Sequence, residues 1–202
     1  MAKIIFIPRL RTDEGFDKLE KDALTWPGTT VKAYGDAPCF TAEHFSSPAN
    51  EIIVMGGHCS AGQAYVGWPG NHQNPVEYGE VVDRLLASGM YGHKDFAGHI
   101  KIYSCQSAEV ERHPNADPIS RDISILGLSF ASAIQRLLLS RGYESCTVWG
   151  YTGNISTALV TKFGKAVGAD LALRATDPRK ARPGGAMFSK TASEAEVRVN
   201  LN

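Results

Sequence analysis

The sequence predicts an α/β fold, with a single domain (residues 1–202) built on a mostly parallel sheet flanked by helices. Three observations predict it. The chain has 202 residues, 43% hydrophobic and 21% charged, which suits one domain with one sizeable core. Short apolar runs of strand length recur along the chain, and amphipathic segments of helical length separate them. This alternation is typical of a parallel sheet covered on both faces.

The predicted strands are short runs rich in β-branched, aliphatic or aromatic residues. The four strongest are residues 3–8, 51–57, 99–104 and 145–150, and a shorter one is expected at 29–34. The first run ends at a proline and the second ends in two glycines, so turn-forming residues mark where each strand stops.

The predicted helices carry apolar side chains at helical spacing. They cover residues 13–24, 76–87 and 125–140. Gly89 and Gly142 follow the second and third of these helices, in the position where glycine commonly ends a helix. Loops are expected at 35–50 and 60–75, and residues 62–70 of the second loop are expected to lie over the site described below.

The pattern weakens after residue 150 and divides a core, about residues 1–155, from a basic C-terminal extension, 156–202. In the extension we expect a short helix at 156–166 and a C-terminal β-hairpin formed by 186–190 and 194–200. Residues 1–160 carry a net charge of −4 and residues 161–202 one of +4. This asymmetry indicates an anion site, a basic tail on an acidic body or, more simply, a solvated surface.

Composition argues against several classes of protein. The 21 Lys and Arg balance 21 Asp and Glu, whereas a dedicated nucleic-acid binder is usually strongly basic. No apolar run reaches the roughly 18–20 residues that span a bilayer. The four cysteines form no C-x-x-C pair, which argues against a zinc ribbon and a thioredoxin-type redox pair. A zinc site built from His58, Cys59, His72 or Cys105 would fit no standard zinc module, so we expect no metal site. The first residues lack a cleaved secretory signal, so the expected location is the cytoplasm, or outside the cell by another route.

Two chemically capable side chains follow consecutive strong strands of the predicted sheet. His58 follows the strand at 51–57, and Cys105 follows the strand at 99–104. If a right-handed crossover makes these strands neighbours, their ends lie about 5 Å apart and both side chains reach one rim. In open α/β sheets, ligands bind outside the carboxyl ends of the strands.

This pair suits nucleophilic catalysis. A thiol needs a nearby base or imidazolium to act as a thiolate, and His58 is placed to serve as that base and later to protonate a leaving amine. The backbone N–H groups of Cys59 and Cys105 are candidates for an oxyanion hole. Taken singly, a histidine or cysteine after a strand is more often a rim or packing residue, but their joint placement favours a function.

The two blocks resemble those of a known family. The residues from Ile52 to His58, Ile-Ile-Val-Met-Gly-Gly-His, and from Ile100 to Ser107, Ile-Lys-Ile-Tyr-Ser-Cys-Gln-Ser, are similar to the histidine and cysteine blocks of the caspase–gingipain–legumain group of cysteine peptidases (clan CD). The small size and the strand that leads into Gly150 most resemble the self-cleaving peptidase domains of large bacterial toxins. The resemblance covers roughly residues 50–155 and implies a caspase-like fold.

The resemblance also implies a role for each site residue. His58 is the general base and acid, and Cys105 the nucleophile, of a dyad that cleaves peptide or protein substrates and requires no cofactor. Specificity in this group comes from loops near the cysteine and from the following strand. The implied substrate-binding residues are therefore Gln106, Trp149, Gly150 and Tyr151. For Trp149, core packing is an equal alternative.

The toxin relatives are activated by inositol hexakisphosphate, which binds in a basic pocket. In this chain the candidates to hold such a polyphosphate are cationic residues of the C-terminal extension, since guanidinium and ammonium groups suit phosphate. They are Lys162, Lys165, Arg174, Arg179, Lys180, Arg182 and Lys190. A solvated tail is the plainer explanation of the same charges.

Two other functions stay open. The family usually has glycine directly after the histidine, where this chain has Cys59, so a catalytically inactive binding or adhesin-like module on the same fold is the main alternative. A hydrolase or acyl-transfer enzyme that uses the same dyad on small molecules is the other. The sequence predicts no particular oligomeric state.

Overall fold

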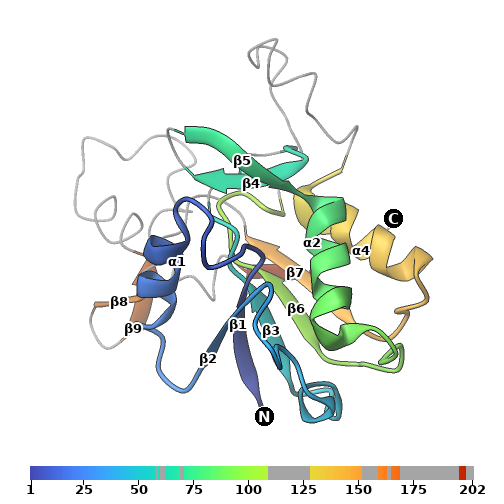
Figure 1. Ribbon diagram of the computed structural model, residues 1–202. Coiled ribbons are helices and arrows are strands. Elements are labelled where there is room, and N and C mark those ends of the chain that lie inside the picture. The colour runs from blue at the N-terminus through green and yellow to red at the C-terminus, as the bar shows by residue number, and fades with distance from the viewer. Residues whose placement is uncertain are drawn as a thin grey trace.

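The computed structural model describes residues 1–57, 59, 62–68, 71–108 and 128–151, and three later strand segments, 159–162, 165–168 and 196–198. Among these residues, a six-stranded sheet has the order β10-β7-β6-β3-β1-β2 (Figure 1). Its strands are β1 (Lys3–Ile7), β2 (Thr30–Ala33), β3 (Glu51–Val54), β6 (His99–Ile102), β7 (Thr147–Tyr151) and β10 (Glu196–Arg198). Neighbours from β2 to β7 run parallel, and β10 pairs antiparallel with β7. The predicted α/β class with a mostly parallel sheet is confirmed.

Helices cover both faces of this sheet, as Figure 1 shows. They are α1 (Phe16–Ala23) on one face, and α2 (Tyr78–Leu85) and α4 (Phe130–Ser140) on the other. Successive side chains of a strand point to opposite faces. In β3, Ile53 packs under α1, whereas Ile52 and Val54 pack under α2 and α4. Burying a side chain of this size contributes about 1.5–3 kcal/mol, so both faces add to the stability of the sheet.

Local sequence sets where the helices begin and end. Gly15 takes a left-handed conformation, φ 78°, before α1, so this helix starts later than the sequence predicts. The hydroxyl of Ser129 caps α4 by accepting a hydrogen bond from Ser132 N–H. α2 continues into a π-helical segment, η2 (Leu86–Met90), which ends around Gly89 at φ 120°. α1, α2 and α4 lie within the ranges predicted for the three helices. Among the described residues, no helix is both long and apolar enough to cross a membrane.

The prediction of a loop at 60–75 is wrong, because this segment contains an antiparallel hairpin. Its strands are β4 (Tyr65–Trp68) and β5 (Asn71–Glu77). The glycines and prolines of the segment obscure short β-forming stretches around Val66 and Val76. Figure 1 shows the hairpin lying across the carboxyl ends of the parallel strands. In the loop expected at 35–50, a short 3-10 helix forms, η1 (Ala42–Phe45).

The prediction of a helix at 156–166 is also wrong. Two antiparallel strands occupy this region, β8 (Leu159–Lys162) and β9 (Lys165–Gly168). The β-branched residues Val160, Thr161 and Val167 suit paired strands better than a helix. Of the predicted C-terminal hairpin, the structure describes only β10, which pairs with β7, and residues 186–190 lie outside the described residues.

Candidate functional site

The ends of β3 and β6 meet at one edge of the sheet, as the sequence predicts. The two strands pair in parallel, and just beyond the paired residues Tyr103 N–H still donates to the carbonyl oxygen of Val54 at 2.8 Å. The chain therefore leaves the two strands side by side, and Cys105 follows on the β6 side. His58, on the β3 side, lies outside the described residues, so its pairing with Cys105 stays a prediction.

Two glycines shape the turn after β3. Gly57 has φ 99°, a conformation that residues with a side chain rarely adopt. A Cβ on Gly56 would lie 2.3 Å from Cγ2 of Val66, so glycine is what lets the β4–β5 hairpin pack against the end of β3. Because Val66 is buried in the core under α2 and α4, the hairpin closes that side of the sheet edge.

Cys59 packs into the core. Its side chain is 0% exposed and lies among the apolar residues under α2 and α4. The side chain that stands where the family has glycine therefore fills space in the core. Any part that Cys59 plays in the predicted oxyanion hole falls to its backbone.

The turn that carries Cys105, residues 104–108, is held by Ser107. The Ser107 hydroxyl donates to the carbonyl oxygen of Ile102 at 2.8 Å and accepts from Tyr151 N–H at 3.0 Å. Its carbonyl oxygen accepts from Ala131 N–H, in the first turn of α4, at 2.9 Å. Ser107 is fully buried, so one residue ties the turn to β6, β7 and α4.

Close packing holds the same turn against β7. A Cβ on Gly150 would come within 2.9 Å of Ala108 and 3.0 Å of Ala131, so glycine is required where the turn and α4 press on the strand. Ala108 N–H also donates to the carbonyl oxygen of Tyr151 at 3.1 Å. Gly150, a predicted substrate-binding residue, therefore faces the turn and α4.

Gln106, directly after Cys105, has a left-handed backbone with φ 51°. For a residue with a side chain this conformation costs about 1–2 kcal/mol, so the surrounding hydrogen bonds must impose it. Backbone strain of this kind clusters at active sites and ligand clamps. Gln106 is half-buried, and its side chain stays a candidate to contact a substrate.

An aromatic wall lies beside Cys105 on the α1 face. The half-buried Cys105 packs against a cluster that contains Tyr103 and Tyr151, with Trp26 at its margin. The Tyr103 ring meets Trp26 and Tyr151 edge to face, with centroids 4.7 and 5.0 Å apart. Burial, and secondarily the nearby Cys105, raises the pKa of Tyr103, so its phenol stays neutral beside the thiol.

Trp149 faces the amino ends of the strands. Its indole N–H lies 3.2 Å from Oγ1 of Thr147 and 3.3 Å from Nδ1 of His99, and these two partners begin β7 and β6. The indole is therefore directed toward the edge opposite to the one that carries Cys105. Trp149 is half-buried and packs edge to face against His99, outside both core clusters.

Cys105 is the most exposed of the four cysteines. Cys39, Cys59 and Cys146 are buried, whereas Cys105 is half-buried, and all four are thiols outside any disulfide. Burial raises the pKa of Cys39 and raises that of Cys146 to about 11, so both stay protonated at neutral pH. A thiol reagent should therefore reach Cys105 before the others.

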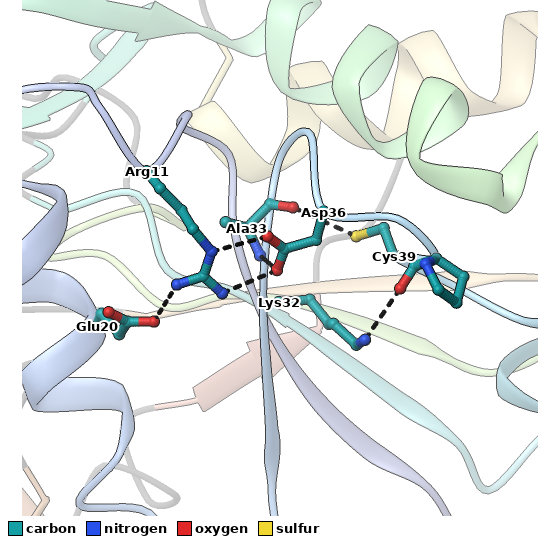
Figure 2. A network of polar contacts seen from close by, with 7 residues as sticks. Arg11, Glu20, Lys32, Ala33, Asp36 and Cys39 are labelled. Atoms are coloured by element: carbon teal, nitrogen blue, oxygen red, sulfur yellow. Dashed lines mark hydrogen bonds and ion pairs between the residues drawn. The ribbon is translucent and has the colours of Figure 1, made fainter.

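A charged network braces the loops that follow β1 and β2 at the same edge of the sheet. Figure 2 shows the guanidinium of Arg11 bonded to both carboxylate oxygens of Asp36, at 2.8 and 3.0 Å, and to Glu20 of α1. Asp36 also accepts from Ala33 N–H at the end of β2. The hydrogen bond from Arg11 lowers the pKa of Asp36, which stays ionised and ties α1 to the sheet.

Among the described residues, no group of three or more His, Cys, Asp or Glu is arranged to hold a metal ion. Of the basic residues expected to bind a polyphosphate, Lys162 and Lys165 lie on β8 and β9, and the others lie outside the described residues. No family model matches the chain, and a search of curated proteins finds no match.

Proposed function

We propose that the protein is a cysteine endopeptidase in which Cys105 is the nucleophile and His58 the base. The observation that carries this proposal is the fixed turn of residues 104–108, which holds the half-buried Cys105 at the carboxyl edge of the sheet. Ligands of α/β proteins bind at that edge. In the chain, His58 follows β3, the strand that pairs with β6, so both residues belong to adjacent strand ends.

The caspase-like fold is part of this proposal. It is supported by a parallel sheet with helices on both faces, and by the placement of the two family-like blocks on neighbouring strands. The side chain of Cys59, which stands where the resembling family has glycine, packs in the core and so is compatible with this fold.

In the proposed reaction, Cys105 Sγ gives its proton to His58 and attacks the carbonyl carbon of the scissile peptide bond. The oxyanion of the tetrahedral intermediate accepts hydrogen bonds from the backbone N–H groups of Cys59 and Cys105. When the C–N bond breaks, His58 passes the proton to the leaving amine, and a thioester remains on Cys105. A water molecule, deprotonated by His58, then hydrolyses the thioester and restores the thiol.

The side chain of Gln106 is proposed to border the substrate residue before the cleaved bond, because it is half-buried directly beside the thiol. Tyr151 is buried against Tyr103 and supports the wall behind the thiol. An extended peptide is the substrate class that we propose to lie along this apolar wall beside the thiol.

A peptidyl acyloxymethyl ketone, which alkylates activated cysteines, tests the dyad. Mass spectrometry is expected to place the label on Cys105, and Cys105→Ala and His58→Ala should each abolish labelling. Cys39→Ala is the matched control, because it removes a buried thiol elsewhere and should leave labelling unchanged. Label found on Cys39 or Cys59 that survives both dyad substitutions would show that the dyad is wrong.

Inositol hexakisphosphate is proposed as an activator, on the basis of the basic residues of the C-terminal extension. The same labelling reaction, run with and without this polyphosphate, tests the proposal. A rate that rises with its concentration supports activation, and a rate that is independent of it removes the proposal.

A catalytically inactive binding module is the second candidate, and Cys59 is the observation that favours it, because the resembling family has glycine there. It predicts alkylation of Cys105 at the rate of an ordinary thiol and no cleavage of a peptide library. It also predicts that a bound partner is retained equally well by Cys105→Ala.

A further inference from the structure

We propose that Ser107 is a positioning residue of the Cys105 site. Its hydroxyl holds β6 and β7 apart at their carboxyl ends and thereby fixes the turn that carries the thiol. The inference rests on the proposed function and deepens it, because it identifies what orients the nucleophile.

The hydrogen-bond ladder between β6 and β7 shows what the Ser107 hydroxyl replaces. Thr147 N–H donates to the carbonyl oxygen of Gly98 at 3.0 Å, and the strands keep this parallel register along their paired length. Such bonds recur every second residue, so the ladder would go on to join Tyr151 N–H to the carbonyl oxygen of Ile102. Instead the hydroxyl of Ser107 lies between these two groups, accepting from the first and donating to the second.

The next ladder position is also taken over by the turn. In a regular ladder Ser104 N–H would donate to the carbonyl oxygen of Tyr151. That oxygen instead accepts from Ala108 N–H at 3.1 Å, and Ser104 N–H turns back to the carbonyl oxygen of Ile102 at 3.0 Å. Gly150 leaves the space that this arrangement needs. The turn is therefore bonded between the two strands and does not hang outside them.

A third contact fixes the turn to α4. The carbonyl oxygen of Ser107 accepts from Ala131 N–H, one of the first helical N–H groups that lack a partner within their own helix. The N–H of Ser107 donates within the turn, to the carbonyl oxygen of Ser104 at 3.4 Å. Every polar group of this buried residue is thus bonded, while Cys105 in the same turn is half-exposed.

Ser104 shows that burial alone does not define this role. It lies in the same turn and is 1% exposed, but its hydroxyl oxygen has no hydrogen-bond partner among the described residues. Of the two buried hydroxyls in the turn, the one on Ser107 bridges the strands.

Loss of the Ser107 hydroxyl has two structural outcomes. Either Tyr151 N–H and the carbonyl oxygen of Ile102 close on each other and push the turn outward, or they stay apart. In the second case Tyr151 N–H is unpaired and the carbonyl oxygen keeps only its bond from Ser104 N–H. In the first case Cys105 is displaced from the groups that it must meet in the reaction, and in the second its turn loses two of the hydrogen bonds that fix it. Misplacement by roughly 1 Å can cost about 100-fold in rate.

The test compares Ser107→Ala with Tyr143→Phe. The Tyr143 hydroxyl donates to the carbonyl oxygen of Met90 at 3.0 Å and lies before the amino end of β7, far along the sheet from Cys105. Tyr143→Phe thus also removes a buried hydrogen bond but leaves the turn intact. Cleavage of fluorescein-labelled casein is measured under conditions in which a urea titration shows both variants folded, and kcat and KM are determined separately.

We expect Ser107→Ala to lower kcat about 10- to 100-fold with KM changed less than about 2-fold, and Tyr143→Phe to keep both values. Ser107→Cys fills the same space with a weaker hydrogen-bonding group, so it should fold and give an intermediate kcat. If Ser107→Ala has the kcat of the wild type, the inference is overturned. If the alanine variant does not fold, the same result in Ser107→Cys overturns it.

The failure of this inference differs from the failure of the proposed function. If Cys105→Ala abolishes cleavage while Ser107→Ala leaves kcat unchanged, the function stands and the positioning role falls. If wild-type cleavage is absent or does not depend on Cys105, the function falls. Amide hydrogen exchange across residues 104–108 then still decides whether Ser107 holds the turn. Faster exchange in Ser107→Ala, but not in Tyr143→Phe, supports that role, and equal exchange overturns it.

Discussion

Ser104 and Ser107 are both buried in the turn around Cys105, yet their hydroxyls differ in what they contact. Removing Ser107 Oγ leaves Tyr151 N–H without its partner and leaves the carbonyl oxygen of Ile102 with only its bond from Ser104 N–H. Removing Ser104 Oγ breaks no hydrogen bond among the described residues. We expect Ser107→Ala to lower the free energy of unfolding by about 1–3 kcal/mol, and Ser104→Ala to leave it unchanged or raise it slightly. Urea titrations of both variants check this. A larger loss in Ser104→Ala would contradict it.

Two carboxylates make stability depend on pH. The hydrogen bond from Arg11 lowers the pKa of Asp36 from its ordinary 3.8. Burial tends to raise the pKa of Glu51, but its bonds to Lys101 and Lys3 outweigh burial, and the net pKa lies below the ordinary 4.5. Each of these carboxyls has a lower pKa in the folded protein than in the unfolded chain. As the pH falls, the unfolded chain therefore binds protons first, and this favours unfolding. The stabilisation is therefore complete above the ordinary pKa values and is lost as the pH falls through the folded ones.

We therefore expect the free energy of unfolding to decrease as the pH falls below about 5, and to go on decreasing through the lowered folded-state pKa values. The change should be smaller in Asp36→Asn, because that variant has no carboxylate to titrate beside Arg11. Asp83→Asn is the control, since the Asp83–Arg141 pair is exposed and such pairs contribute little. Urea titrations across this pH range give the comparison, and an Asp36→Asn curve parallel to that of the wild type would refute the assignment.

The sequence identifies Cys105 as a site residue because its chemistry and its place after an apolar strand are both local features. The role of Ser107 is not local. Its partners, Ile102 and Tyr151, come together only when β6 and β7 pair, and a serine in a turn gives no sign of that. The burial of Cys59 likewise depends on the direction in which the chain turns after β3.

At the scale of elements, continuous apolar runs predict strands well, because such runs are buried on both faces of a parallel sheet. β1, β3, β6 and β7 overlap their predicted ranges for this reason. The hairpins β4–β5 and β8–β9 were missed because their strands mix polar residues with apolar ones, and because glycine and proline in the first hairpin favour a loop assignment. Their pairing is a tertiary feature that weak local propensity does not show.

The packing of the β4–β5 hairpin on the end of β3 leads to a prediction for two glycines. A Cβ on Gly56 would lie 2.3 Å from Val66, whereas a Cβ on Gly67, in the same hairpin, would have its nearest neighbour at 3.9 Å. Gly56→Ala is expected to lower the free energy of unfolding by about 1–3 kcal/mol through overpacking. Gly67→Ala should change it much less. Thermal and urea unfolding of the pair check this, and equal losses would show that the hairpin does not depend on the close approach.

At the scale of the whole molecule, alternation of strands and helices predicts a parallel sheet covered on both faces, and right-handed crossovers predict that consecutive strands are neighbours. Both expectations hold for β3 and β6, which is why the rim that carries Cys105 could be anticipated. The same expectation holds for β1 and β2 and for β6 and β7, and it fails only between β2 and β3, because β3 pairs with β1. The sequence also does not state which helix covers which face. That assignment places α1 and its aromatic neighbours beside the thiol, on the face opposite to α2 and α4.

The distance between the imidazole of His58 and the sulfur of Cys105, measured in a crystal structure of the unliganded protein, tests the proposed dyad most directly. We expect roughly 4–6 Å, with an open path to the thiol, since the hydrogen bonds of such pairs tighten only when substrate is bound. Side chains found on opposite faces or opposite edges of the sheet would contradict the peptidase proposal.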